Sequence, residues 1–190
     1  MKKIILSALV AGAAIYAVPA SAQDVTGTVN LSGSVAPKCL VVPSNGDTYT
    51  DSINFGELAG PDGTLRSGLD TDFNAKAFAF RVVCTTPDPT VSVDADPLAT
   101  TTAADTGYDN SIDYTATVTV TTTGTNAGPF ANASDTPAGT ATAIGSRLAN
   151  NGGNNVAISA SNFHTNNPTD LLVAANDYAG KITVVIAPGA

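Results

Sequence analysis

The most informative stretch of the sequence is V-T-G-T-V-N-L-S-G-S-V, which runs from Val25 to Val35. Every second residue is apolar or glycine, and the residues between them are threonine, asparagine or serine. Because side chains alternate between the two faces of a strand, this pattern predicts a strand with one apolar face. That face is formed by Val25, Gly27, Val29, Leu31, Gly33 and Val35. Such a strand needs an edge to pair with, either in its own domain or in another chain.

The residues before this stretch are typical of a secretory signal peptide. A basic start, M-K-K, is followed by mostly apolar residues 4–18 and by a small-x-small cleavage site at residues 20–22. The apolar run is shorter than the roughly 20 residues that a membrane span needs. We therefore expect residues 1–22 to be removed, and the mature chain to be exported without inserting into a membrane.

Composition and charge point to an exported β-protein. Without the leader, the chain carries six basic and sixteen acidic residues, a formal charge of −10. This charge disfavours binding to nucleic acid and to anionic membrane surfaces. The chain has no tryptophan and is rich in threonine, alanine, asparagine, glycine and valine, and its length fits one domain with a mostly aliphatic core.

Cys39 and Cys84 are the only cysteines of the chain. In an exported protein an even pair predicts a disulfide. Closing a loop of about 45 residues would stabilise the fold by roughly 4 kcal/mol on the chain-entropy model. A metal pair or a catalytic thiol is the alternative. Both are disfavoured because the sole histidine, His164, is far away in sequence and no Cys-x-x-Cys spacing is present.

Short alternating segments predict strands through the rest of the chain. Residues 114–121 (Y-T-A-T-V-T-V-T) alternate apolar residues with threonine, which favours strands. Further strands are predicted at residues 53–56, 78–84, 91–93, 156–160 and 178–186. Segments dense in glycine, proline, asparagine and aspartate predict loops at residues 43–51, 60–68, 94–113, 122–139 and 150–155, and a helical turn is expected within residues 138–148. The pattern predicts an all-β fold, an antiparallel sandwich of the immunoglobulin-like kind.

Catalytic and metal-binding signals are weak. The sequence has no Gly-x-Ser-x-Gly elbow, His-Glu-x-x-His helix or phosphate loop, and His164 lies in a polar segment where we expect a solvated loop histidine. The best calcium candidate combines Asp94 and Asp96 with the acidic residues of 105–113, but it lacks a recognisable loop spacing. We therefore predict no enzymatic activity and no cofactor. An exported hydrolase or sugar-binding domain that uses the acidic loops is the least favoured alternative.

Four stretches resemble the subunits of chaperone–usher fimbriae, the pilins. G-T-V-N-L-S-G-S-V-A-P-K-C (residues 27–39) is similar to their N-terminus, where an alternating strand interrupted by glycine closely precedes the first cysteine. I-N-F-G (53–56), F-R-V-V-C (80–84) and D-Y-A-G-K-I-T-V-V-I (177–186) are similar to later parts of such subunits. The Thr/Val-rich style and the residues A-P-G-A at 187–190 also resemble the spore coat U-like proteins of the archaic branch of this pathway.

The resemblance implies an incomplete immunoglobulin-like sandwich, residues 36–190, that a donor strand from a neighbouring subunit completes. Residues 23–35 would be the N-terminal donor strand. Its apolar residues Val25, Val29, Leu31 and Val35 would fill a hydrophobic groove, and Gly27 and Gly33 would lie where that groove is too shallow for a side chain. The last strand would form one groove wall and the surface that the chaperone contacts, through Tyr178, Gly180, Ile182, Val184 and Ile186.

The partners implied by the resemblance are copies of the same chain in a head-to-tail polymer, a periplasmic chaperone and an outer-membrane usher. The subunit would cross the periplasm and end in a cell-surface fimbria that supports adhesion or biofilm formation. The alternative is a self-complete secreted β-sandwich that acts as a coat or binding protein. It stays open because alternation alone does not decide whether residues 25–35 pair within their own domain.

Overall fold

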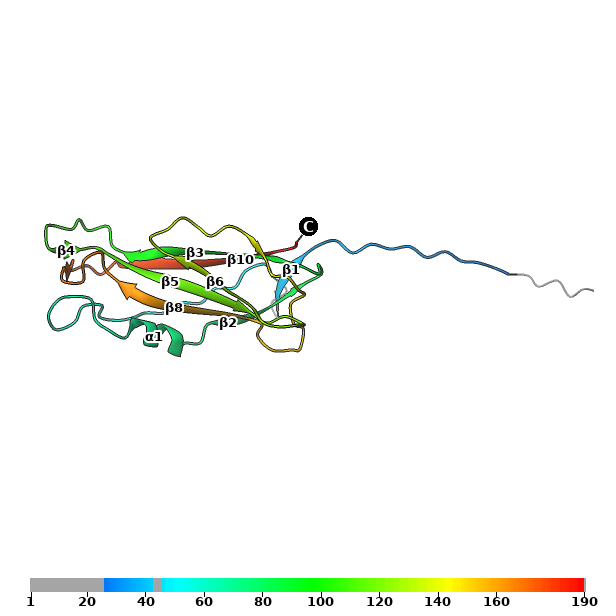
Figure 1. The fold of residues 1–190 in the computed structure, drawn as a ribbon, viewed down its shortest axis with the longest axis horizontal. Helices are drawn as coiled ribbons and strands as arrows, with labels where there is room; N and C mark the ends of the chain where they lie inside the picture. The colour runs from blue at the N-terminus through cyan, green and yellow to red at the C-terminus, as the bar shows by residue number, and fades with distance from the viewer. Residues whose placement is uncertain (1–25, 43–45, 190) are drawn as a thin grey trace, which may run out of the picture. The chain divides into compact units, whose positions relative to one another are not determined.

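The computed structural model describes residues 26–42 and 46–189, so the predicted signal peptide and Val25 lie outside the described residues. The chain divides into two units, residues 1–34 and 35–190, and every assigned helix and strand belongs to the second. In chain order these elements are β1 (Cys39–Val42), α1 (Leu69–Ala75), β2 (Ala79–Cys84), β3 (Thr90–Ala99), β4 (Tyr108–Asp109), β5 (Ser111–Val120), β6 (Ala127–Ala133), β7 (Thr142–Ala143), β8 (Val156–His164), β9 (Leu171–Leu172) and β10 (Ala179–Ala187) (Figure 1). The all-β prediction is confirmed.

Most strands join in one antiparallel sheet that bends around a single core. Its order is β1-β2-β8-β5-β3-β10, with β6 paired to β5 and β7 paired to β3. β1 and β10 are therefore the two edges of this order. β4 and β9 form a separate parallel pair. In the part of the chain that the structure describes, no helix is both long and apolar enough to span a membrane.

β5 shows how the threonine-rich alternation builds the core. Its apolar residues Ile112, Ala116, Val118 and Val120 are fully buried, whereas Thr119 on the opposite face is exposed. The strand is central, because β8 pairs with one of its edges and β6 with the other. Apolar side chains of β2, β3 and β8 pack against it, namely Val82, Val91, Val93, Val156 and Ala160.

Two buried asparagines bridge places where strand pairing is interrupted. The side chain of Asn155 accepts a hydrogen bond from the Val82 N–H at 2.8 Å and donates one to the Val82 carbonyl at 2.7 Å. Asn132 on β6 accepts one from the Ala95 N–H at 2.9 Å. Buried backbone groups need partners, so these amides replace missing strand neighbours.

The helix α1 packs against β8 next to the beginning of β2 (Figure 1). Leu69 and Phe73, four residues apart on one helical face, are its buried residues. The Asn74 amide donates to the Ala160 carbonyl at 3.0 Å and accepts from the Ala160 N–H at 3.2 Å. A side chain thus completes the edge of β8 where the pairing with β2, which covers only Ala157 and Val156, has stopped.

The predicted disulfide between Cys39 and Cys84 is present. The two residues are direct partners in the register of β1 and β2, with their Cα atoms 4.1 Å apart. The bond therefore joins one edge strand to the sheet at the start of that strand. In the described residues no cysteine is free.

Several predicted boundaries were wrong. Residues 94–113 and 122–139, expected as loops, contain the second half of β3, the pair-forming β4, the start of β5 and all of β6. Residues 53–56, expected as a strand, have no assigned strand, and 138–148 contain β7 in place of a helical turn. Pairing with the central strand β5 outweighs the weak strand propensity of A-G-P-F-A-N-A in β6.

Candidate functional site

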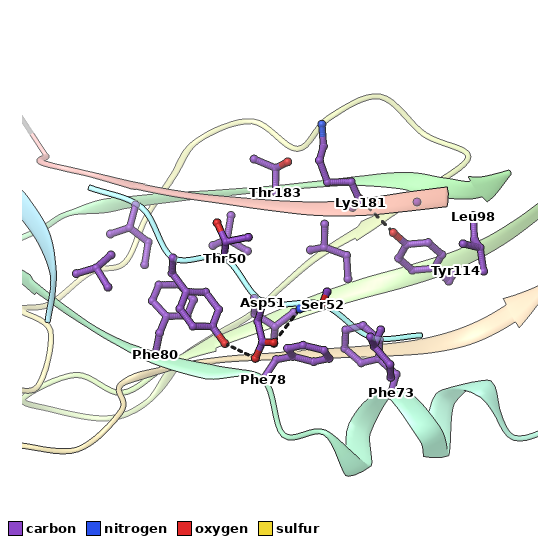
Figure 2. Close-up of a pocket in the computed structure, with 18 of the residues that line it drawn as sticks. Thr50, Asp51, Ser52, Phe73, Phe78, Phe80, Leu98, Tyr114, Lys181 and Thr183 are labelled. Carbon is purple, nitrogen blue, oxygen red and sulfur yellow. Dashed lines mark hydrogen bonds between the residues drawn. The ribbon is translucent and has the colours of Figure 1, made fainter. Parts of the chain in front are cut away.

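An open groove of about 670 Å³ lies between the two edge strands of the sheet (Figure 2). β10 forms one wall. β1, followed by the extended residues 47–55, lines the other side. The groove is therefore located where the strand order of the sheet is interrupted.

Aromatic rings form the floor of the groove. Five of the six phenylalanines of the chain line it, namely Phe55, Phe73, Phe78, Phe80 and Phe163. The Phe73 and Phe78 rings lie 4.8 Å apart between centroids, and the Phe163 ring stacks on Tyr114 at 5.2 Å. Figure 2 shows Phe73, Phe78 and Phe80 along one side of the opening. A floor of this kind binds apolar side chains.

The β10 wall presents apolar side chains that the domain covers only in part. Ile182, Val184 and Ile186 line the groove and are half-buried, whereas Val91 and Val93 on the neighbouring β3 are buried. Val185, between Val184 and Ile186, is not among the groove residues and is exposed on the outer surface. Among the described residues, the inner face of β10 is thus covered less completely than that of β3.

The register of β10 also fixes the direction of its backbone groups. Val93 and Ala95 use the edge of β3 that faces away from β10, since the Val93 carbonyl accepts from Gly139 and the Ala95 N–H donates to Asn132. Their partners on β10, Val184 and Ile182, are therefore at non-hydrogen-bonded positions of the antiparallel pair. Their N–H and C=O groups point to the free edge of β10, toward the groove. In the described chain this edge has no strand partner.

The segment 47–55 crosses the opposite side of the groove without an assigned strand. Its exposed Tyr49 stacks on Phe80 with 4.5 Å between ring centroids and donates a hydrogen bond to the Asp51 carboxylate at 3.2 Å. Asp51 also forms an ion pair with Lys76 at 3.4 Å. The Ser52 N–H donates to the same carboxylate and, with Lys76 and Tyr49, lowers the pKa of Asp51. Charged groups thus lie at the rim and not on the floor.

Tyr114 joins the floor to the β10 wall. Its hydroxyl lies 3.1 Å from the Lys181 carbonyl on β10 (Figure 2) and 2.8 Å from the Asp96 carbonyl on β3, so one donor serves both strands. Burial raises the pKa of Tyr114, and the nearby carboxylates of Asp96 and Asp94 raise it further. The hydroxyl therefore stays protonated and holds the start of β10.

The predicted donor segment is exposed wherever it is described. Val29, Leu31 and Val35 are 85%, 92% and 77% exposed. A Cβ atom added at Gly27 or Gly33 would meet nothing within 4 Å. No strand is assigned to residues 26–38. Three large apolar side chains are thus left without cover in this segment.

All five residues predicted for the groove wall line the groove. Gly180, Ile182, Val184 and Ile186 belong to β10, and Tyr178 precedes it, with its hydroxyl donating to the Val173 carbonyl at 3.0 Å. Gly180 has a packing role that the sequence did not indicate. A Cβ atom there would lie 3.0 Å from the Leu98 Cα, at a bulge in the pairing of β10 with β3.

The acidic residues considered for calcium have other positions. Asp94 and Asp96 belong to β3, and Asp96 pairs with Lys181 at 3.2 Å. The buried Asp109 carboxylate accepts hydrogen bonds from the backbone of Ser111 and Asn166. No group of three or more His, Cys, Asp or Glu residues that could hold a metal ion occurs within residues 26–42 and 46–189.

His164 ends β8 and is exposed, so it lies on a strand end and not in the expected loop. It is not among the residues that line the groove.

Sequence reasoning missed the aromatic floor, although a signal was present. Only six phenylalanines occur in the chain, and four of them fall within residues 55–80.

In comparisons with protein-family models, curated proteins and solved structures, no match to this chain was found.

Proposed function

We propose that the protein is a structural, non-enzymatic subunit of a surface fimbria. In this proposal the domain is an incomplete immunoglobulin-like sandwich, and the groove between β1 and β10 accepts residues 25–35 of a second copy. The observation that carries the proposal is that β10 combines two features. One of its edges has no strand partner in the described chain, and its apolar inner face is only partly covered. An added strand satisfies both at once, because it brings backbone partners and alternating side chains.

The exposed segment has the chemistry that such a groove requires. Burying a valine or leucine side chain contributes about 1.5–3 kcal/mol, so Val29, Leu31 and Val35 together supply roughly 5–9 kcal/mol before ordering costs. The intervening residues are threonine, asparagine and serine, which remain solvated on the outer face. They carry no charge that would have to be buried.

The length of the proposed donor segment also agrees with the length of the groove wall. Residues 25–35 span about 36 Å when extended, and the wall from Tyr178 to Ile186 spans about 30 Å. The segment is thus long enough to cover the wall with a short remainder that connects two domains.

The ends of the domain favour a head-to-tail polymer. β1 begins opposite Cys84 and β10 ends opposite Thr90, and Figure 1 shows both at the same end of the domain. A segment that runs antiparallel to β10 would therefore place its own domain beyond the opposite end of the acceptor, near Tyr178. This contact is heterologous and repeats without closing, as a fibre requires. A parallel segment would bring like ends together.

Before assembly, a periplasmic chaperone would cover the groove and the outer-membrane usher would exchange it for the next subunit. The open β10 edge supports this part of the proposal, because an uncovered apolar edge is prone to aggregation.

Electrophoresis of a cell-surface extract in SDS, with and without boiling, tests the proposal. Antibodies against this chain should detect a ladder of multimers in the unboiled sample that collapses to monomer on boiling. Such resistance to SDS is expected of strands held by a long run of backbone hydrogen bonds and buried side chains.

Monomer in both lanes would contradict strand exchange. It would favour the self-complete secreted sandwich, in which residues 25–35 pair with their own domain or bind no partner.

A further inference from the structure

Thr85, the residue after the second cysteine, contacts the backbone of residues 36–38 at several points. Its hydroxyl accepts a hydrogen bond from the Lys38 N–H at 2.9 Å and donates to the Ala36 carbonyl at 3.1 Å. The Thr85 N–H donates to the Lys38 carbonyl at 2.9 Å, and Arg147 donates to the Thr85 carbonyl at 3.1 Å. We call this set of contacts the Thr85 clamp.

The clamp continues the β1–β2 pairing beyond the disulfide. Cys39 is paired with Cys84, so Lys38 and Thr85 are the next pair along the same two strands. Residues 36–38 form neither a turn nor a bend. They therefore approach β1 along the line of that strand.

The sequence by itself permits another course. Pro37 fits the first central position of a β-turn as well as an extended chain. A reversal within residues 36–38 would turn residues 25–35 back toward the chain's own groove, along residues 47–55. β1 itself is not free on this side, because the Val41 N–H donates to the Gly46 carbonyl at 2.9 Å. The tethered segment has an effective concentration in the millimolar range, far above that of a second copy. Self-insertion would thus be the faster reaction unless something opposes it.

We propose that the Thr85 clamp opposes self-insertion and so reserves the groove for the segment of a second copy. This inference rests on the proposed function. A reversal at residues 36–38 has to break the contacts of the Thr85 hydroxyl with Ala36 and Lys38, whereas insertion into another copy leaves them intact. The clamp therefore selects the partner without touching the groove.

The test compares full-length chains refolded at low subunit concentration with the disulfide kept oxidised. The probe is a fluorescent peptide with the sequence of residues 23–35, and its binding reports whether a groove is open. Thr85→Val removes the hydroxyl at nearly constant shape. We expect the fraction of monomer that binds the peptide to fall about threefold to tenfold, as expected for the loss of two modest hydrogen bonds. Thr85→Ser keeps the hydroxyl and should bind like the wild type.

A second background separates the clamp from the groove. Val29→Asp/Leu31→Asp disables the chain's own segment, so its groove should stay open to the peptide with or without Thr85→Val. If that background binds the peptide but wild type and Thr85→Val bind it equally, the clamp proposal is wrong and the proposed function stands. If that background does not bind the peptide at all, the proposed function fails, and the clamp proposal fails with it.

Discussion

Residues 26–35 and strand β5 have nearly the same pattern and opposite surroundings. Both alternate apolar residues or glycine with polar ones. Val118 and Val120 in β5 are 0% exposed, whereas Val29 and Leu31 are 85% and 92% exposed. Alternation thus defines two faces of a strand, but the neighbouring elements decide whether the apolar face finds cover.

β10 lies between these two extremes. It pairs on one edge only, and its inward side chains Ile182, Val184 and Ile186 are half-buried. The sheet therefore changes from complete burial at β5 to an open edge at β10. One chain thus has an exposed alternating segment and a strand edge without a strand partner in the described residues, and in the proposed fibre the segment of one copy covers the edge of another.

The comparison is tested most strongly by placing the same charge in both regions. Val118→Asp buries an unpaired carboxylate in the centre of the core and should cost more than about 4 kcal/mol, enough to unfold a domain of ordinary stability. Leu31→Asp should leave the unfolding temperature of the monomer unchanged and abolish the SDS-resistant ladder. Circular dichroism on heating and electrophoresis measure the two effects. An equal loss of stability in both variants would show that residues 26–35 belong to the core of their own domain.

Loss of the disulfide should have the next largest effect. Cys39→Ser frees an edge strand that lines the groove, and the chain-entropy model gives a loss of roughly 4 kcal/mol. We expect the yield of folded subunit to fall before any defect in assembly can be seen. The measurement is the amount of soluble subunit bound to the chaperone in the periplasm, with Cys39→Ser/Cys84→Ser as the control without a free thiol. Wild-type yields from both variants would refute the expectation.

Glycines in the two regions should respond in opposite ways. Gly180→Ala brings a Cβ atom to 3.0 Å from the Leu98 backbone, so β10 has to shift away from β3, at a cost of about 1–3 kcal/mol. Gly33→Ala meets nothing and should leave the monomer within about 0.5 kcal/mol of the wild type. Unfolding in guanidinium measures both.

The larger Gly33→Arg should also leave the monomer stable, yet block assembly because its side chain has no room in the groove. Normal fibres from Gly33→Arg would refute the assigned register of the donor strand, while leaving the contrast between Gly33 and Gly180 in the monomer untouched.

The strands that were predicted well are those whose own residues have a strong strand pattern. Residues 114–121 and 178–186 alternate strongly, and both appear as strands with boundaries shifted by a few residues. β6 was missed because its residues have little strand propensity and become a strand through pairing with β5. The helix α1 was not predicted, although Asp70 and Asp72 lie in its first turn. With Leu69 and Phe73 four residues apart, the same acids mark a helical first turn.

The groove was predictable in part. The alternation within residues 178–186 identified the side chains of one wall, because a strand repeats every two residues. The floor was not predictable, since Phe55, Phe78 and Phe163 meet only after the sheet has bent and α1 has packed on β8. The bond from Tyr114 to two carbonyls is likewise a consequence of tertiary structure.

The smallest expected effect concerns this tyrosine and depends on pH. The pKa of Tyr114 is raised above its usual value near 10 in the folded chain, chiefly by burial. Its protonated hydroxyl therefore contributes stability in full below pH 10, and that contribution is lost as the pH rises toward the folded-state pKa. Tyr114→Phe should cost about 1 kcal/mol at neutral pH through the lost hydrogen bond and should weaken the decline in stability above pH 10.

Unfolding in guanidinium at neutral pH and above pH 10 compares Tyr114→Phe with Tyr108→Phe, which changes an exposed ring. Part of the decline in stability above pH 10 should remain in Tyr114→Phe, because burial also raises the pKa of Tyr49 and of Tyr178. If the decline in Tyr114→Phe is as steep as in the wild type, the hydroxyl does not hold β10 to the sheet. The open edge of the groove would then be fixed by its pairing with β3 alone.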